Sequence, residues 1–287
     1  MTAIYKRELK SYFNNVIGYI FCAFILLFVG IYTMAINLTG GSASFEYSIG
    51  NMAFIYMIAV PVLTMRVIAE ERKQKTDRLL YSLPMSMSEV VMGKFFALLT
   101  VLLIPTIISC IYPLILSSFG KINFFASYGT ILAFFLLGSA LLSMGLFISS
   151  LTDNQITAVI STFVVLLINY YIVTLADYVS YSTTATFIAF TVLIVLAAAC
   201  IYTITKNSVV AVLAAAVGEL VLFVYKLVNP DALYGVFPKL MSRISVFERF
   251  YNFPNGMFDF TSVAYFLTVT AVFLFLTVQA MEKRRWS

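Results

Sequence analysis

The sequence predicts an all-α polytopic membrane protein, with an N-terminal interfacial helix followed by six to eight membrane-embedded helices. Of its 287 residues, 62% are hydrophobic and only 11% are charged, whereas a soluble domain carries about a quarter charged residues. Such a chain cannot cover a water-facing surface, so we expect one transmembrane domain over residues 1–287, in the cell membrane. The basic residues behind the net charge of +5 flank apolar runs, which argues against a nucleic-acid partner.

The first 15 residues predict a helix that lies at the membrane surface. Apolar and basic side chains fall on opposite sides at helical spacing, with Ile4, Tyr5, Leu9, Tyr12 and Phe13 against Lys6, Arg7 and Lys10. This amphipathic pattern is typical of a helix at the headgroup level. The alternative is a charged lead-in to the first span.

Eight apolar runs follow, and each is long enough to enter a membrane. They cover residues 16–38, 49–69, 94–117, 124–150, 156–176, 185–205, 208–228 and 260–281. We expect a kink at Pro61 and a bent helix around Pro105 and Pro113. We also expect close helix packing along a stripe of small residues, Gly138, Ser139, Ala140, Ser143 and Gly145. The runs 185–205 and 208–228 are either two full spans or a re-entrant hairpin.

The distribution of basic residues predicts that both termini are cytoplasmic. With eight spans, 13 of the 18 Lys and Arg residues lie on inner segments and five on outer ones, in agreement with the positive-inside rule. A six-span arrangement with a re-entrant pair keeps the same termini. Residues 229–259 then lie outside the membrane. Their charges alternate with aromatic side chains and predict a surface-lying amphipathic segment, with Phe237, Phe247, Phe250, Tyr251 and Phe253.

The stretch 66–94 is the longest strongly charged run, and it holds six of the 18 basic residues. Within it, Thr76 can cap a short helix that runs to Tyr81. The apolar members of that helix, Leu79 and Leu80, could fill a groove on a partner. The alternative is a solvated, positive-inside loop that binds no partner.

Two further signals bound this short helix. Pro84 ends it, because the residue before proline avoids the α region. Ser86 and Glu89 then form a capping box that begins the next helix. On the other side, Arg66 and Glu70 are four residues apart and share a helix face. We expect the acid pair Glu70 and Glu71 to tie the second span to the N-terminal helix.

The chain lacks the residues of common catalytic sites. There are no histidines, which excludes histidine-based triads and most zinc sites. The cysteines lie singly in apolar runs, which predicts no disulfide framework, and they are Cys22, Cys110 and Cys200. The pair Gly93-Lys94 is not a phosphate-binding loop, because Phe95 replaces the Ser or Thr and the preceding glycine is missing.

Two polar residues inside apolar runs are candidates for lining a pathway. Glu219 is the only acidic residue deep in such a run, and buried acids usually face a cavity or a partner. It is either a substrate or proton-linked site or a polar anchor in a hairpin. Asn169 is the second candidate, and helix packing is the alternative for it.

Three stretches of the sequence resemble one family. The first comprises Glu70-Glu71-Arg72, Thr76, Leu79-Leu80, Ser82, Pro84, Ser86, Glu89 and Gly93-Lys94. The second is residues 149–155, and the third runs from Tyr265-Phe266-Leu267 to residues 282–286. Together they resemble type-2 ABC exporter permeases, in particular the gliding-motility branch and its relatives in the nitrous-oxide-reductase maturation operon.

The resemblance implies a permease subunit of an ATP-binding-cassette exporter. ATP and Mg²⁺ would bind to separate ATPase subunits, so this chain would hold no cofactor and would not be an enzyme. A second permease chain would complete a homodimer or heterodimer in the lipid. The implied coupling segment is residues 70–93, with contacts at Glu70, Glu71, Arg72, Thr76, Asp77, Arg78, Leu79, Leu80, Ser82 and Pro84.

Two residues of this segment depart from the family pattern. Lys75 stands where the family usually has Gly, and Arg78 stands where it usually has Glu. Both changes make the segment more basic, so we expect an ATPase partner matched to this subunit. The alternative function is a secondary, ion-coupled transporter, which predicts several buried ionisable residues and an internal repeat.

Overall fold

The computed structural model describes residues 1–75, 85–229 and 233–285, and the secondary structure in these ranges is helical. Seven helices in the described part of the chain are long and apolar enough to cross a membrane. The predicted all-α polytopic fold is therefore confirmed. Contacts divide the chain into two compact units, Met1–Ile168 with Arg249–Ser287, and Asn169–Glu248.

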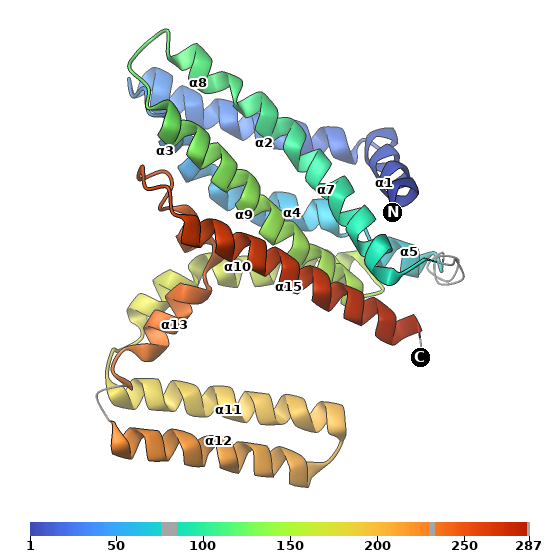
Figure 1. Ribbon diagram of the computed structural model, residues 1–287, viewed down its shortest axis with the longest axis vertical. Helices are drawn as coiled ribbons and strands as arrows, with labels where there is room; N and C mark the ends of the chain where they lie inside the picture. The colour runs from blue at the N-terminus through green and yellow to red at the C-terminus, as the bar shows by residue number, and fades with distance from the viewer. Residues whose placement is uncertain (76–84, 230–232, 286–287) are drawn as a thin grey trace. The chain divides into compact units, whose positions relative to one another are not determined.

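The first unit contains most of the helices (Figure 1). In chain order they are α1 (Thr2–Asn14), α2 (Ile17–Tyr32) with a π-helical continuation (Thr33–Thr39), α3 (Phe45–Met52), a 3₁₀ turn (Ala53–Ile55), α4 (Tyr56–Thr64), α5 (Ala69–Lys73), α7 (Met87–Ser109), α8 (Ile111–Leu116), α9 (Phe124–Leu151), the first part of α10 (Gln155–Tyr178) and α15 (Phe260–Arg285).

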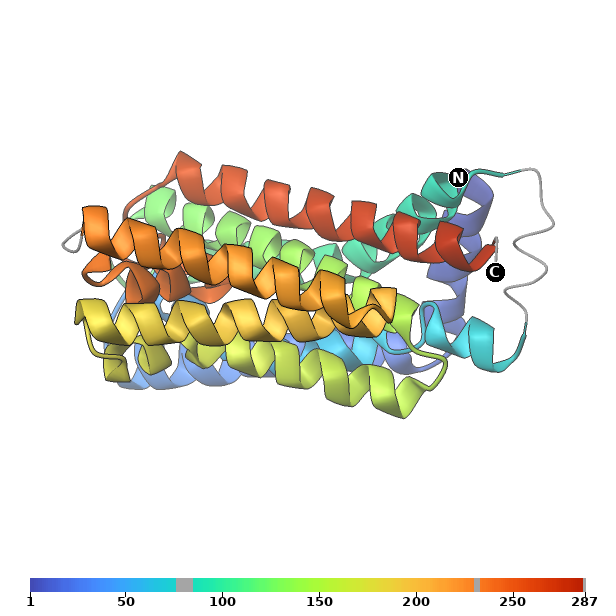
Figure 2. The same ribbon diagram turned by 90° about the horizontal axis from the view of Figure 1, so that it is seen from below.

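The N-terminal helix lies across the direction of the long helices of its unit. Figure 2 shows α1 running crosswise at one end of the unit, the end at which α5 and the C-terminal end of α15 also lie. The loop between α8 and α9 lies at the opposite end (Figure 1). An amphipathic helix in this orientation suits a membrane surface, and the two termini share one end of the unit.

Helix α9 forms the centre of the first unit, where it contacts α3, α4, α7 and α15 (Figure 1). The stripe of small residues makes this possible, as predicted. A Cβ added at Gly138 would lie 2.7 Å from Leu102 Cδ2 and 2.8 Å from the Tyr56 hydroxyl. A Cβ added at Gly145 would lie 2.5 Å from Thr64 Oγ1. The absence of these side chains lets α4 approach α9 closely.

The proline-containing spans are irregular in different ways. Pro61 lies inside α4, and the departures from α geometry flank that helix, in the 3₁₀ turn and at residues 65–68. Helix α7 ends at Ser109 and α8 begins at Ile111, so the long helix expected to bend around Pro105 and Pro113 is interrupted at Cys110. Pro113 has no N–H to donate to the Ser109 carbonyl four residues before it, which accounts for a break at this place.

Side-chain caps begin several helices, and the cap at Ser86 lies where the sequence predicts it. Ser86 and Glu89 form the capping box of α7, in which the Ser86 hydroxyl accepts from the Glu89 amide at 3.3 Å. Asn154 Oδ1 accepts from the Ile156 amide at 3.0 Å at the start of α10. At the start of α15, Asp259 accepts from the hydroxyls of Ser262 and Thr261 and from the amides of both residues. These bonds, above all those from the two hydroxyls, lower the Asp259 pKa to about 2.

The second unit contains the end of α10, the helices α11 (Thr183–Thr205), α12 (Ser208–Val228) and α13 (Val236–Ile244), and the start of α14 (Val246–Phe250). Helices α11 and α12 lie side by side as an antiparallel hairpin (Figure 1). Lys206 takes a left-handed conformation with φ 54° at the turn, and Asn207 caps α12. At 1.5 Å per residue, both helices reach the roughly 30 Å of a bilayer core.

The interpretation of residues 229–259 as a surface-lying segment is wrong for three of its aromatic residues. Phe247, Phe250 and Phe253 are all at most 2% exposed. Within the first unit, the Phe250 ring packs against Phe134 of α9 at 6.2 Å between centroids. The alternation with charges reflects a segment whose aromatic side chains face inward and whose polar side chains face outward. Composition alone does not distinguish such a segment from one that lies on a surface.

Gly145→Ala should destabilise the protein, because the new methyl group would overlap Thr64. Overpacking of this kind costs about 1–3 kcal/mol, which thermal unfolding of the purified chain in detergent would measure. Gly30→Ala is the control, since the nearest atom to its added Cβ is 4.0 Å away. Adding Thr64→Ala to Gly145→Ala should restore part of the loss. Equal melting temperatures for the two glycine variants would contradict the packing argument.

Candidate functional site

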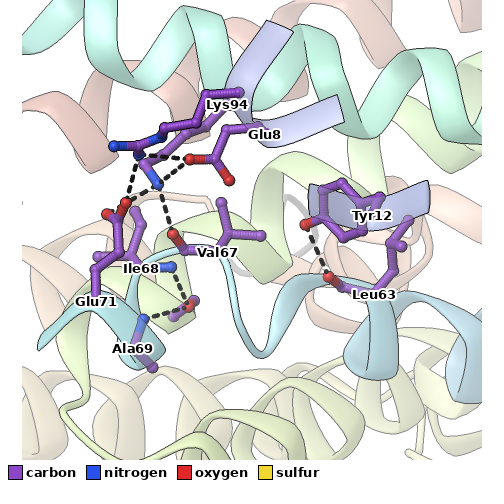
Figure 3. Close-up of polar contacts among 10 residues, drawn as sticks. Glu8, Tyr12, Leu63, Val67, Ile68, Ala69, Glu71 and Lys94 are labelled. Atoms are coloured by element: carbon purple, nitrogen blue, oxygen red, sulfur yellow. Dashed lines mark hydrogen bonds and ion pairs between the residues drawn. The ribbon is translucent and has the colours of Figure 1, made fainter. Parts of the chain in front are cut away.

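The candidate site is centred on the three consecutive residues Glu70, Glu71 and Arg72 in α5. This short helix begins after the turn that ends α4, and Gln74 and Lys75 separate it from residues 76–84. The Ser149 hydroxyl of α9 accepts from the Ile68 and Ala69 amides at 3.4 and 3.2 Å (Figure 3). The start of α5 is therefore fixed to α9, and the three side chains extend from a held position.

Glu71 belongs to an ion cluster that joins three helices, with Arg7 and Glu8 from α1 and Lys94 from α7 (Figure 3). The Lys94 ammonium lies 2.9 Å from Glu71 Oε2 and 3.1 Å from Glu8 Oε1. It also donates to the Val67 carbonyl at 2.8 Å. Arg7 Nη2 lies 2.7 Å from both carboxylates. Cations and anions thus alternate around the cluster.

Gly93 explains how α1 reaches the buried ammonium of Lys94. A Cβ added at Gly93 would lie 3.2 Å from Ile4 Cβ and from the Met1 carbonyl oxygen, so a side chain there would crowd the start of α1. Tyr12, further along α1, donates from its hydroxyl to the Leu63 carbonyl at 3.3 Å (Figure 3). Gly93 thus leaves room for the start of α1, and the adjacent Lys94 binds Glu8 of the same helix.

Glu8 and Arg7 stay ionised because the opposite charges around them outweigh the effect of burial. Burial alone would raise the pKa of Glu8, but Lys94 and Arg7 outweigh it and the pKa of the carboxyl is lowered. Burial alone would lower the pKa of Arg7, but Glu8 and Glu71 outweigh it and the pKa is raised. Near neutral pH, both groups are therefore charged.

Arg72 connects α5 to the turn between α9 and α10. Its guanidinium is buried, and Nη1 donates to the Ser150 carbonyl and lies 3.7 Å from Asp153 Oδ1. Arg284, near the end of α15, lies 2.5 Å from the same Asp153 oxygen and donates to the Leu151 carbonyl at 3.1 Å. Asp153 thus sits between two arginines, and three distant sequence stretches meet at this turn.

The remaining candidate residues of the coupling segment divide into two groups. Glu70 lies 3.7 Å from Arg66, the pair that the four-residue spacing predicts, and it accepts from Gln74 at 3.2 Å. Of the acid pair, Glu71 forms the ion pair with the N-terminal helix, to Arg7, whereas Glu70 pairs with Arg66 in the described part of the chain. The other candidates lie outside the described residues, namely Thr76, Asp77, Arg78, Leu79, Leu80, Ser82 and Pro84.

The two candidate pathway residues both make contacts within the second unit. Glu219 is half-buried in α12 and accepts from the Thr191 hydroxyl of α11 at 3.2 Å, as a polar anchor of the hairpin would. The Asn169 amide is buried, and its Oδ1 accepts from the Val246 amide at 3.0 Å. Its Nδ2 donates to the Ile244 carbonyl at 3.4 Å. These contacts favour the packing alternative for Asn169.

Sequence reasoning missed Glu8 and Glu46, and it did not assign a site role to Lys94. Glu8 had a signal, because it falls midway between Ile4 and Tyr12 on the apolar side of α1. Glu46 is only 7% exposed and accepts from the Ser127 hydroxyl at 2.9 Å, so Glu219 is not alone as a buried acid. In the described ranges, no group of three or more Cys, Asp or Glu side chains is placed to hold a metal ion.

These observations define a polytopic helical membrane protein whose charged residues gather at one end of its main unit. A comparison with protein families matches residues 3–286 to the ABC-2 family transporter proteins, and the chain belongs to this family. It is therefore a multi-pass membrane component of ABC transport. No curated protein was found to match it in sequence.

Lys94→Met should strongly destabilise the protein. The substitution keeps the length of the side chain but leaves Glu8 and Glu71 facing each other without the ammonium, and breaking such a buried pair costs about 3–5 kcal/mol. The exposed Lys10→Met is the matched control, and thermal unfolding in detergent is the measurement. Adding Glu8→Gln should restore part of the loss. If the two lysine variants unfold at the same temperature, the cluster has no structural role.

Proposed function

We propose that this chain is the permease subunit of an ATP-binding-cassette exporter of the gliding-motility type, driven by separate ATPase subunits. The observation that supports this is the convergence at α5. Two residues of α5, a few positions before the segment 76–84, contact the neighbouring helices. Glu71 contacts α1 and α7, and Arg72 contacts the end of α9. A force applied to that segment would reach most of the first unit.

The proposed mechanism is a lever. ATP and Mg²⁺ bind on the ATPase subunits, and their closure displaces residues 76–84. The displacement passes through α5 to α1 and α7 by way of Glu71, and to the α9–α10 turn and α15 by way of Arg72. Two permease chains, identical or different, then tilt their spans and open the pathway between them. In this proposal the end with α1 and both termini faces the cytoplasm.

The ATPase contact can be tested by co-purification. Leu79→Asp with Leu80→Asp should release the ATPase from membranes that still contain the inserted permease, because charge replaces the apolar face that fills the ATPase groove. Phe119→Asp is the control, since Phe119 is exposed in the α8–α9 loop, at the end away from α1. Undiminished co-purification of the double variant would refute the docking segment.

The lever can be tested by comparing the two adjacent acids. Glu71→Gln should leave the ATPase bound and active but reduce the ATP-driven change in distance between spin labels at Lys10 and Lys283. Glu70→Gln should change this distance little, because its half-exposed pair with Arg66 remains within its own segment and is worth under about 1 kcal/mol. Equal behaviour of the two variants would contradict a path through Glu71.

A further inference from the structure

A polar cavity of about 390 Å³ lies between α1 and the segment that joins α4 to α5. Its size falls within the range of about 300–1,000 Å³ that small-molecule sites occupy. Charged and amide side chains form much of its lining, namely Arg7, Glu8, Asn15, Arg66, Glu70, Glu71 and Gln74. The ion cluster thus has one side that faces a cavity, and neither the fold nor the proposed lever requires that space.

An apolar groove of about 170 Å³ continues from this cavity between α2 and α4. Ile17 lines both spaces, so they are neighbours. The groove is lined by hydrophobic side chains, among them Ile20, Phe21, Phe24, Ile58 and Val62. A charged cavity beside the surface helix, followed by an apolar groove along two spans, matches the two chemical parts of a membrane lipid.

We propose that the two spaces form a binding site for a glycerophospholipid whose headgroup carries both a phosphate and a primary ammonium, as in phosphatidylethanolamine. The half-exposed guanidiniums of Arg7 and Arg66 would bind the phosphate. Within the described residues, Arg66 Nε is buried without a hydrogen-bond partner, and its nearest carboxylate oxygen, on Glu70, is 3.7 Å away. A phosphate oxygen satisfies this donor.

The charge of the lining selects the headgroup. Two guanidiniums face three carboxylates, and the ammonium of Lys94 behind Glu8 and Glu71 balances the remaining negative charge. A neutral zwitterion fits this balance, whereas an anionic headgroup would add an unmatched charge beside the carboxylates. Glu70 is the most exposed of the three carboxylates, and it can accept hydrogen bonds from a primary ammonium. A quaternary ammonium, as in phosphatidylcholine, has no N–H to donate.

The lining of the groove argues for an acyl chain as its occupant. The groove is lined by hydrophobic side chains and adjoins the charged cavity at Ile17. A lipid carries a charged headgroup and a hydrocarbon chain in one molecule, so it matches both spaces, and its flexible chain can follow the surface of Phe21, Phe24 and Val62. The lipid would therefore hold α1 against α2 and α4 from the membrane side.

Native mass spectrometry of the delipidated full chain tests the site. Phosphatidylethanolamine, phosphatidylglycerol and phosphatidylcholine with identical acyl chains would be added one at a time. We expect one phosphatidylethanolamine to bind roughly tenfold more tightly than the other two lipids, the effect of one charge-assisted hydrogen bond. Glu70→Gln should reduce this preference, because it removes the carboxylate that accepts from the ammonium, and Arg66→Gln should weaken the binding of all three lipids. Equal binding of the three lipids would overturn the proposal.

Val62→Trp tests the groove, because the indole would fill it. Leu27→Trp is the matched control, on an exposed apolar residue of α2 that does not line the groove. We expect Val62→Trp to lose the bound lipid and Leu27→Trp to keep it, with both variants unfolding as the parent does in lipid-free detergent. If Val62→Trp misfolds, Arg66→Gln remains as the test. Retained lipid in a folded Val62→Trp variant, or a change in oligomeric state without loss of lipid, would overturn the proposal.

Discussion

The buried ammonium of Lys94 is the constraint on which one end of the protein depends. A charge removed from water is tolerated only with opposite charges and hydrogen-bond acceptors around it, and Lys94 obtains them from Glu8, Glu71 and the Val67 carbonyl. These partners come from α1, α5 and the turn between α4 and α5. Lys94 can therefore be buried only where α1, α5 and the turn before α5 lie beside α7.

The same requirement, that a buried charge needs acceptors around it, holds for Arg72 of α5. Its buried guanidinium needs acceptors, and the end of α9 provides the Ser150 carbonyl while the following turn provides Asp153. Helix α9 can reach this position because its small residues let it run close to α4. The tight packing at Gly138 and Gly145 and the charged contacts of α5 are thus parts of one arrangement, in which α5 is positioned by the spans on both sides.

The sequence predicted the features that depend on local chemistry. These features follow from the residue types and their spacing within a few residues. They are the spans, the capping box at Ser86, the break in the helix before Pro113 and the pairing of Arg66 with Glu70. The partnership of Glu8 with Lys94 does not, because 86 residues separate them and only the crosswise docking of α1 brings them together. The alternation of aromatic and charged residues led to a wrong prediction for Phe250, which is buried. The same pattern occurs in a segment that lies on a surface and in one that buries a face in the protein.

The charged contacts around α5 differ in burial, and this difference decides how the end of the unit can move. The side chains of Lys94 and Arg72 are 0% and 3% exposed, whereas those of Arg7, Arg66 and Arg284 are 40–53% exposed. Exposed pairs contribute under about 1 kcal/mol each and are screened by salt, so they can exchange partners readily. The buried contacts are costly to break. A displacement of α5 would therefore carry α7 and the α9–α10 turn with it, while the outer arginines exchange partners.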